Sequence, residues 1–119
     1  MFDLQLTSSA EKDLDGLQEI RAVVVQELLV LKTHPEKGHL LKQNLQGIRS
    51  LEFSIKGSGQ YRAAYLVLET AVVCLIVAVG THENFYDLLA RRAKKLKGLL
   101  KEVKAVARKK TSTRPINKA

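Results

Sequence analysis

The sequence predicts one α+β domain, in which two N-terminal helices pack on a twisted antiparallel sheet of about four strands. A long C-terminal helix is expected to close the structure. Three patterns predict this class: strict apolar–polar alternation at residues 2–6, helical spacing of apolar residues over residues 14–31, and strand-like segments over residues 51–79. With 119 residues, 45% of them hydrophobic, the chain is long enough to bury one core.

The N-terminal third predicts a strand followed by two helices. Residues 2–6 alternate as in a half-buried strand, and Ser8 with Glu11 has the spacing of a capping box. Leucine, isoleucine and valine then recur every three or four residues, and Gly16 divides this pattern into two helices. The second helix is expected to end before Pro35, because a residue that precedes proline avoids the helical conformation. A loop follows to about Gly47.

Three strands are predicted after this loop. Residues 51–55 alternate between apolar and polar, residues 61–68 place apolar side chains on both faces of a strand, and Gly57 and Gly59 supply the turn between the two segments. A second turn at Glu69 and Thr70 leads into residues 72–79, which are apolar throughout, as is typical of a strand inside a sheet.

The C-terminal third predicts a helix, a basic continuation and a tail. After a turn at residues 80–83, apolar residues recur at 4-3-4-3 spacing from Leu89 to Val103, the mark of a packing stripe. Residues 91–119 carry twelve Lys/Arg and one acid, whereas residues 1–90 carry eight Lys/Arg and eleven acids. We therefore expect a domain at residues 1–92, a basic amphipathic continuation of the helix at 93–110 and a disordered basic tail at 111–119. The basic cluster is either a contact for phosphate backbones or a solvated face.

Composition excludes several classes of protein. The lone Cys74 lies in an apolar run, so we expect it to be buried, and one cysteine forms no internal disulfide framework. We expect no membrane span and no secretion signal, and hence a cytoplasmic protein. We also expect no cofactor. His34 and His39 are predicted to lie at the surface. Together with His82 they lack the local ligand spacing of a metal site, so no metal is expected.

Arg62, His82 and Tyr86 have no obvious structural reason to stand where they do. Arg62 interrupts an apolar strand, His82 follows the last strand, and Tyr86 is one helical turn further on. Arginine holds phosphoryl oxygens with a planar fork, and histidine exchanges protons near neutral pH. A structural interpretation stays open for each: Arg62 paired with Glu52 or Glu69, His82 as a helix-start residue, and Tyr86 as a core aromatic.

The order of these residues resembles the RelE/ParE superfamily, the toxins of type II toxin–antitoxin systems. The resemblance rests on a Y-R-x-x-Y strand, an apolar strand and a G-x-H-x-x-x-Y corner, preceded by the segments HPEKG and LQGIR. It implies a ribosome-dependent mRNA endonuclease that needs no metal, uses the RNA 2′-hydroxyl as nucleophile and inhibits translation. Arg62, His82 and Tyr86 would be catalytic, while Lys56 and Arg49 would hold flanking phosphates. The implied partners are a cognate antitoxin, in a hetero-oligomer, and the ribosome with its mRNA.

The chain departs from part of this pattern. Several RelE-type enzymes carry two lysines where this chain has Glu52 and Ser54, and a second arginine where it has His82. The histidine with its aromatic neighbour looks like the YafQ-type branch. Two other functions remain open: a ParE-like, non-enzymatic inhibitor of DNA gyrase, and a degenerate member that only binds RNA or a partner protein.

Overall fold

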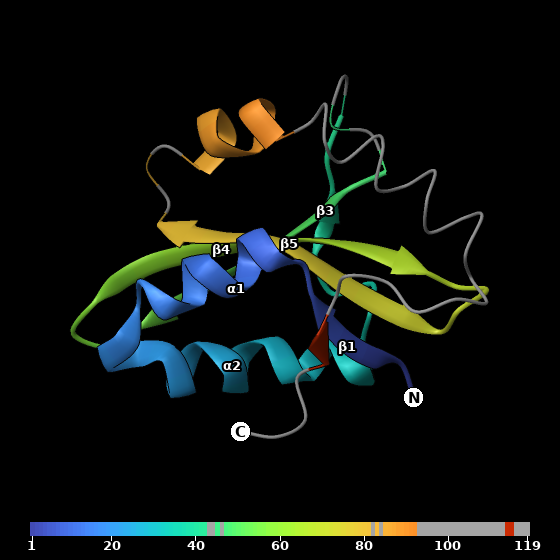
Figure 1. Ribbon diagram of the computed structural model, residues 1–119, viewed down its shortest axis with the longest axis horizontal. Helices are drawn as coiled ribbons and strands as arrows, with labels where there is room; N and C mark the ends of the chain where they lie inside the picture. The colour runs from blue at the N-terminus through green and yellow to red at the C-terminus, as the bar shows by residue number, and fades with distance from the viewer. Residues whose placement is uncertain (43–44, 46, 82, 84, 93–113, 116–119) are drawn as a thin grey trace.

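A mixed six-stranded sheet forms the centre of the fold, in the order β2-β3-β4-β5-β1-β6. The computed structural model describes residues 1–42, 45, 47–81, 83, 85–92 and 114–115. Figure 1 shows α1 and α2 on one side of the sheet and the helix at residues 85–92, drawn in orange, on the other. The predicted α+β class and the two N-terminal helices are confirmed. The predicted continuation at residues 93–110 lies outside the described residues.

The N-terminal elements follow the prediction except at the first cap. Strand β1 spans Asp3–Leu6 and helix α1 spans Ser8–Asp15. The cap is Thr7, whose hydroxyl accepts a hydrogen bond from the amide of Ala10 at 3.1 Å, so the expected Ser8 cap is wrong by one residue. Gly16 ends α1 as predicted. A 3₁₀ turn at Gln18–Ile20, helix α2 at Arg21–Leu29 and a second 3₁₀ turn at Val30–Lys32 follow.

The three longest strands form a meander. A two-residue strand β2 (His39–Leu40) pairs with β3 (Arg49–Ile55), which pairs with β4 (Gly59–Leu68), which pairs with β5 (Val73–Thr81), all antiparallel. The β3–β4 turn has positive φ at Gly57 (81°) and Gly59 (111°), which glycine adopts at little cost. Val72 also has a positive φ, of 56°, so β5 begins one residue later than predicted.

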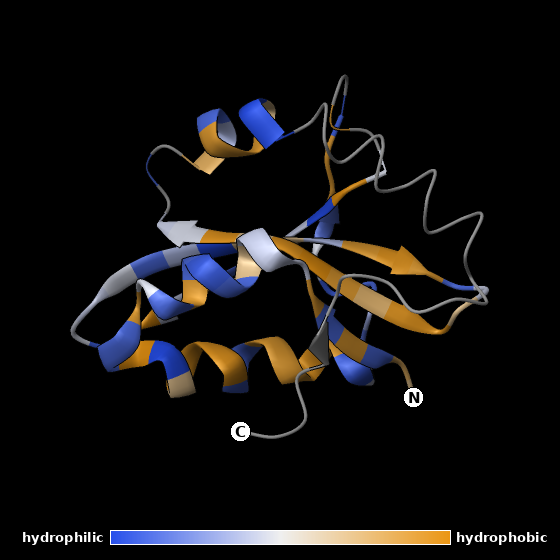
Figure 2. Cartoon of the chain, viewed as in Figure 1, coloured by the Kyte–Doolittle hydropathy of each residue, from blue (hydrophilic) through white to orange (hydrophobic). Residues whose placement is uncertain are grey.

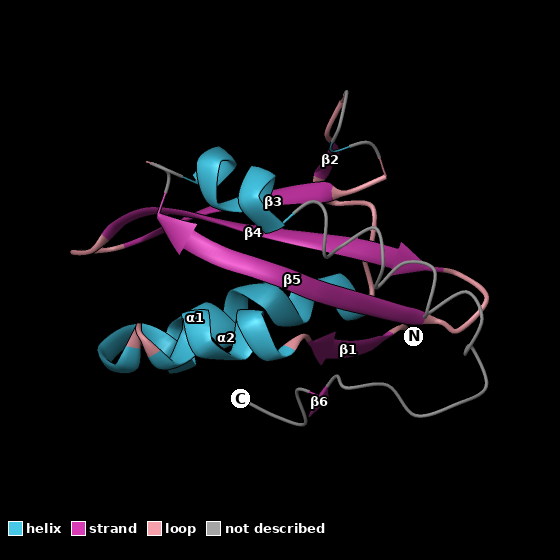
Figure 3. Cartoon of the chain, turned by 45° about the horizontal axis from the view of Figure 1, so that its top comes forward, coloured by secondary structure: helices cyan, strands magenta, loops and turns pink. Residues whose placement is uncertain are grey.

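The sheet is not wholly antiparallel, which corrects the prediction. Strand β1 lies beside β5 and parallel to it, from Asp3↔Val73 to Leu6↔Ile76. Hairpins join only strands that are close in sequence, whereas β1 and β5 are separated by both helices and three strands. On its other side β1 pairs with β6 (Arg114–Pro115), so these two residues of the expected disordered tail form a short strand (Figure 3). The other tail residues lie outside the described part of the chain.

Apolar side chains of β4 and β5 belong to two core clusters, one on each face of the sheet. Much of both strands is orange in Figure 2, the colour of hydrophobic residues. Tyr61, Ala63 and Tyr65 face α1 and α2, whereas Ala64 and Leu66 pack with Phe85 and Leu89 of the helix at 85–92. Cys74 is fully buried as predicted, and its burial, together with the charge of Glu36, raises the pKa of the thiol to about 11. No helix within the described residues is long and apolar enough to cross a membrane.

Candidate functional site

Arg62 lies near the middle of the sheet, on the face covered by the C-terminal helix. In the strand register it stands between Glu52 of β3 and Gly80 of β5. Its neighbours Tyr61 and Ala63 face the opposite core, because side chains alternate along a strand. The alternation of β4 therefore sets the face of Arg62. Arg62 is only 8% exposed, although it carries a full charge.

Two side chains hold the Arg62 guanidinium from different elements. Its Nη1 donates to the hydroxyl of Tyr86 at 2.5 Å and lies 3.0 Å from Oε2 of Glu52. Its Cζ also lies 5.0 Å from the centre of the Tyr86 ring, which is within the range of a cation–π contact. Tyr86 is 42% exposed and is thus no core aromatic, while Phe85 beside it is buried. The helix at 85–92 consequently buries Phe85 and presents Tyr86 to Arg62.

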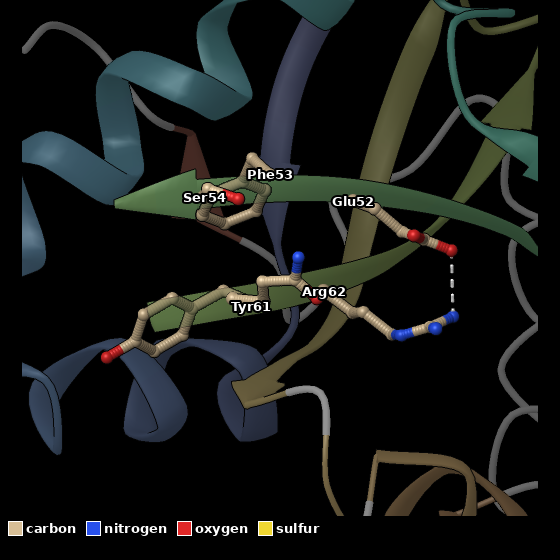
Figure 4. A pocket seen from close by; sticks show the side chains of 6 residues that line it. Glu52, Phe53, Ser54, Tyr61 and Arg62 are labelled. Carbon is tan, nitrogen blue, oxygen red and sulfur yellow. Dashed lines mark ion pairs between the residues drawn. The ribbon is translucent and has the colours of Figure 1, made fainter. Parts of the chain in front are cut away.

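A cavity of about 140 Å³ opens beside this pair (Figure 4). Its lining comes from the two strands of the β3–β4 hairpin and comprises Glu52, Phe53, Ser54, Gln60, Tyr61 and Arg62. Figure 4 shows the side chains of Glu52 and Arg62 reaching toward each other from adjacent strands, joined by their ion pair. The side chain of Glu52 is 51% exposed and that of Arg62 only 9%, so the carboxylate is the more accessible of the two charged groups. Tyr86 contacts Arg62 but is not one of the lining residues.

The other predicted site residues do not join this group. Arg49 faces the same side of the sheet as Leu51 and Phe53, and its Nη1 donates to the carbonyls of Glu36 at 3.2 Å and Gly38 at 2.5 Å. Lys56 lies exposed at the β3–β4 turn and does not line the cavity. His82 lies outside the described residues. Of the five predicted residues, the structure therefore brings together Arg62 and Tyr86.

Glu52 is the residue that the sequence interpretation placed in a structural role only. Among the described residues that line the cavity, it is the only carboxylate. Part of the signal was present in the strand pattern, because Glu52 takes a regular polar position of an alternating strand and Arg62 interrupts an apolar one. The two become direct neighbours in the β3–β4 register, Glu52↔Arg62.

No group of three or more metal-ligating side chains occurs within the described part of the chain. The side chain of His34 is engaged locally, with Nδ1 lying 2.9 Å from the hydroxyl of Thr33.

Comparison with known proteins assigns a family to this fold. A family model described as a ParE-like toxin of type II bacterial toxin-antitoxin systems matches residues 4–90. A chain of the RelBE2 toxin–antitoxin complex of Mycobacterium tuberculosis is 26% identical, with a TM-score of 0.60, and the match covers 68% of this chain and 98% of that one. A mutant of E. coli toxin RelE in the free state is 23% identical, with a TM-score of 0.60 and coverage of 79% and 95%. No curated protein sequence matches.

The E. coli likeness is below 25% identity and supports the fold alone, whereas the family model spans well over half of the sequence. The chain therefore belongs to the ParE-like toxins of type II bacterial toxin–antitoxin systems, within the RelE/ParE superfamily.

Proposed function

We propose that this toxin is an endoribonuclease that cleaves mRNA on the ribosome and so inhibits translation. The observation that carries the proposal is the pairing of Glu52 with Arg62, 3.0 Å apart, at the wall of an open polar cavity. An ion pair of this kind is a poor device for stability, since burying Arg62 costs solvation free energy. A cation and an exposed carboxylate side by side are, however, what cleavage of RNA by its own 2′-hydroxyl requires.

The chemistry assigns one role to each group. The 2′-oxygen attacks the neighbouring phosphorus, the bond from phosphorus to the 5′-oxygen breaks, and a 2′,3′-cyclic phosphate and a 5′-hydroxyl result. Glu52 takes the proton from the 2′-hydroxyl, because it is the accessible carboxylate of the cavity. Arg62 stabilises the negative charge that builds on the phosphoryl oxygens. His82 remains the proposed acid that protonates the departing 5′-oxygen, on the strength of its place in the sequence.

Tyr86 has a supporting role in this scheme. Its hydroxyl and ring hold the guanidinium of Arg62 from the helix side, while its exposed part can stack on a base. Lys56, exposed at the hairpin turn, remains a proposed contact for a flanking phosphate. Arg49 is left out of the proposed site, since its guanidinium is bonded to main-chain carbonyls on the other face.

We further propose that a cognate antitoxin binds this toxin and holds it inactive in the cytoplasm. Two similar chains come from complexes described as toxin–antitoxin complexes, RelBE2 of M. tuberculosis and the intact RelBE of E. coli. The basic residues 93–110 are a proposed contact for ribosomal or messenger RNA, in keeping with their excess of positive charge.

Induction of the chain in cells, followed by mapping of message ends, tests the activity. We expect translated messages to be cut and DNA to stay intact. Arg62→Ala should slow cleavage by about 10²–10³-fold, the usual cost of one transition-state charge contact. Glu52→Gln should also lose cleavage, because an amide accepts no proton. Arg21→Ala is the control, since Arg21 forms an exposed ion pair with Asp15, at 3.6 Å. Purified toxin with mRNA, with and without ribosomes, tests the ribosome requirement.

Inhibition of DNA gyrase without catalysis is the second candidate. It is favoured by the burial of Arg62, which leaves little of its guanidinium accessible to a phosphate group. The description of the matching family model as ParE-like points the same way. Double-strand breaks in DNA, with intact messages and unchanged toxicity of Arg62→Ala and Glu52→Gln, would establish this alternative.

A further inference from the structure

A second ion pair, formed by Asp13 and Arg92, joins the two helical layers around the edge of the sheet. Asp13 belongs to α1 on one face, whereas Arg92 belongs to the helix at 85–92 on the other (Figure 1). Arg92 Nη1 donates to Asp13 Oδ2 at 2.8 Å and Nη2 donates to Oδ1 at 2.8 Å. Both side chains are largely buried, 14% exposed for Asp13 and 20% for Arg92.

The same two side chains also bond the main chain of β5. The amide of Val79 donates to Asp13 Oδ2 at 3.0 Å, and Arg92 Nη1 donates to the carbonyl of Val77 at 3.0 Å. Pairing of β1 with β5 ends at Ile76, and a bulge opposite Ala64/Tyr65 leaves Val77 without a partner on β4. The ion pair therefore occupies a stretch of β5 that β1 no longer covers.

This arrangement fixes the C-terminal helix in rotation as well as in place. Phe85, Leu89 and Arg92 follow at i, i+4 and i+7 and so share the face turned to the sheet. Phe85 and Leu89 are buried, but apolar contacts have little directional preference and tolerate small rotations. A bidentate arginine–carboxylate pair has a fixed geometry. Tyr86 is about one quarter of a turn away from Phe85, so a rotation of the helix would move its hydroxyl off Arg62.

We propose that Asp13 and Arg92 are positioning residues, which set the C-terminal helix so that Tyr86 lies against Arg62. The inference rests on the proposed function only where it speaks of cleavage. Neither side chain contacts the cavity, so they act through Tyr86, and their effect on the reaction is one of alignment.

The test compares Arg92→Met with Arg21→Met, which removes the exposed partner of Asp15 and serves as the matched control. Circular dichroism checks folding, and the NMR resonances of the Arg62 guanidinium and the Tyr86 ring report their contact. We expect Arg92→Met to shift these resonances and Arg21→Met to leave them in place. Wild-type resonances in a folded Arg92→Met protein would overturn the proposal. If Arg92→Met does not fold, Arg92→Lys, which keeps the charge but loses the bidentate geometry, decides by the same resonances.

Cleavage kinetics distinguish a positioning role of Arg92 from a purely structural one. Arg92→Met should lower kcat on the order of tenfold to a hundredfold with little change in KM, because misalignment of about 1 Å has effects of that size. In a Tyr86→Phe background the same substitution should cost little more, and full additivity of the two losses would contradict an action through Tyr86. If the wild-type toxin cuts no message, the proposed function fails, while the resonances still decide whether the pair positions Tyr86.

Discussion

Removal of the Tyr65 hydroxyl should lower the free energy of unfolding far more than removal of the Tyr61 hydroxyl. The Tyr65 side chain is fully buried, and its hydroxyl accepts from the amide of Gly38 at 2.8 Å and donates to the carbonyl of Pro35 at 2.7 Å. In Tyr65→Phe the buried amide of Gly38 loses its partner, at a cost of about 1–3 kcal/mol. The partly exposed carbonyl of Pro35 adds about 0.5–1.5 kcal/mol. The free energy of unfolding should therefore fall by about 1.5–4.5 kcal/mol.

Urea unfolding at equilibrium measures this change. With an m-value of about 2 kcal/mol per molar, the midpoint should fall by roughly 1–2 M while m stays constant. Tyr61→Phe is the matched control, because the Tyr61 hydroxyl bonds a side chain, the Ser58 hydroxyl at 2.5 Å, beside the hairpin turn, and no buried amide within the described residues. That variant should lose about 1 kcal/mol or less. Equal losses in the two variants would refute the reasoning, since they would mean that the amide of Gly38 finds water once the hydroxyl is gone.

Three further predictions follow from other contacts. Val72→Asn should raise the melting temperature by about 3–5 °C, because Val72 is exposed and has a φ of 56°. This conformation costs a branched residue about 1–2 kcal/mol and asparagine less. An unchanged melting temperature would contradict this. Arg49→Met should lower stability, through the loss of its bonds to the 36–38 loop, without weakening RNA binding; a binding defect in the folded variant would return Arg49 to the site. Burial raises the pKa of the Cys74 thiol from 9.0 to about 11. The contribution of the protonated thiol to the free energy of unfolding is therefore complete below pH 9 and is lost as the pH rises toward 11. The free energy of unfolding should fall by about 1 kcal/mol between pH 8 and pH 10, and Cys74→Ala should remove that pH dependence. A pH dependence that persists in Cys74→Ala would mean that another group titrates.

The fold was predictable where the pattern is local. Strand patterns in the sequence located β3 and β4, and alternation along β4 explains why Arg62 lies on the face opposite Tyr61. Local patterns decide less where several residues compete, as at the start of α1, where Thr7 and Ser8 are both good caps and Thr7 has the role. They decide nothing about β1, because the choice of β5 as its parallel neighbour depends on packing between segments about seventy residues apart in sequence.

The candidate site divides along the same line. Arg62 and Tyr86 belong to one continuous motif, so the sequence predicts both as site residues. Glu52 reaches Arg62 only through the register of the β3–β4 hairpin, and a slip of one residue would turn every side chain of a strand to the other face. The turn at Gly57 and Gly59 holds that register with two positive-φ positions, which few other residues adopt. The pairing of the carboxylate with the guanidinium is thus a property of the turn as much as of the two residues, and a sequence motif that contains only Arg62 cannot report it.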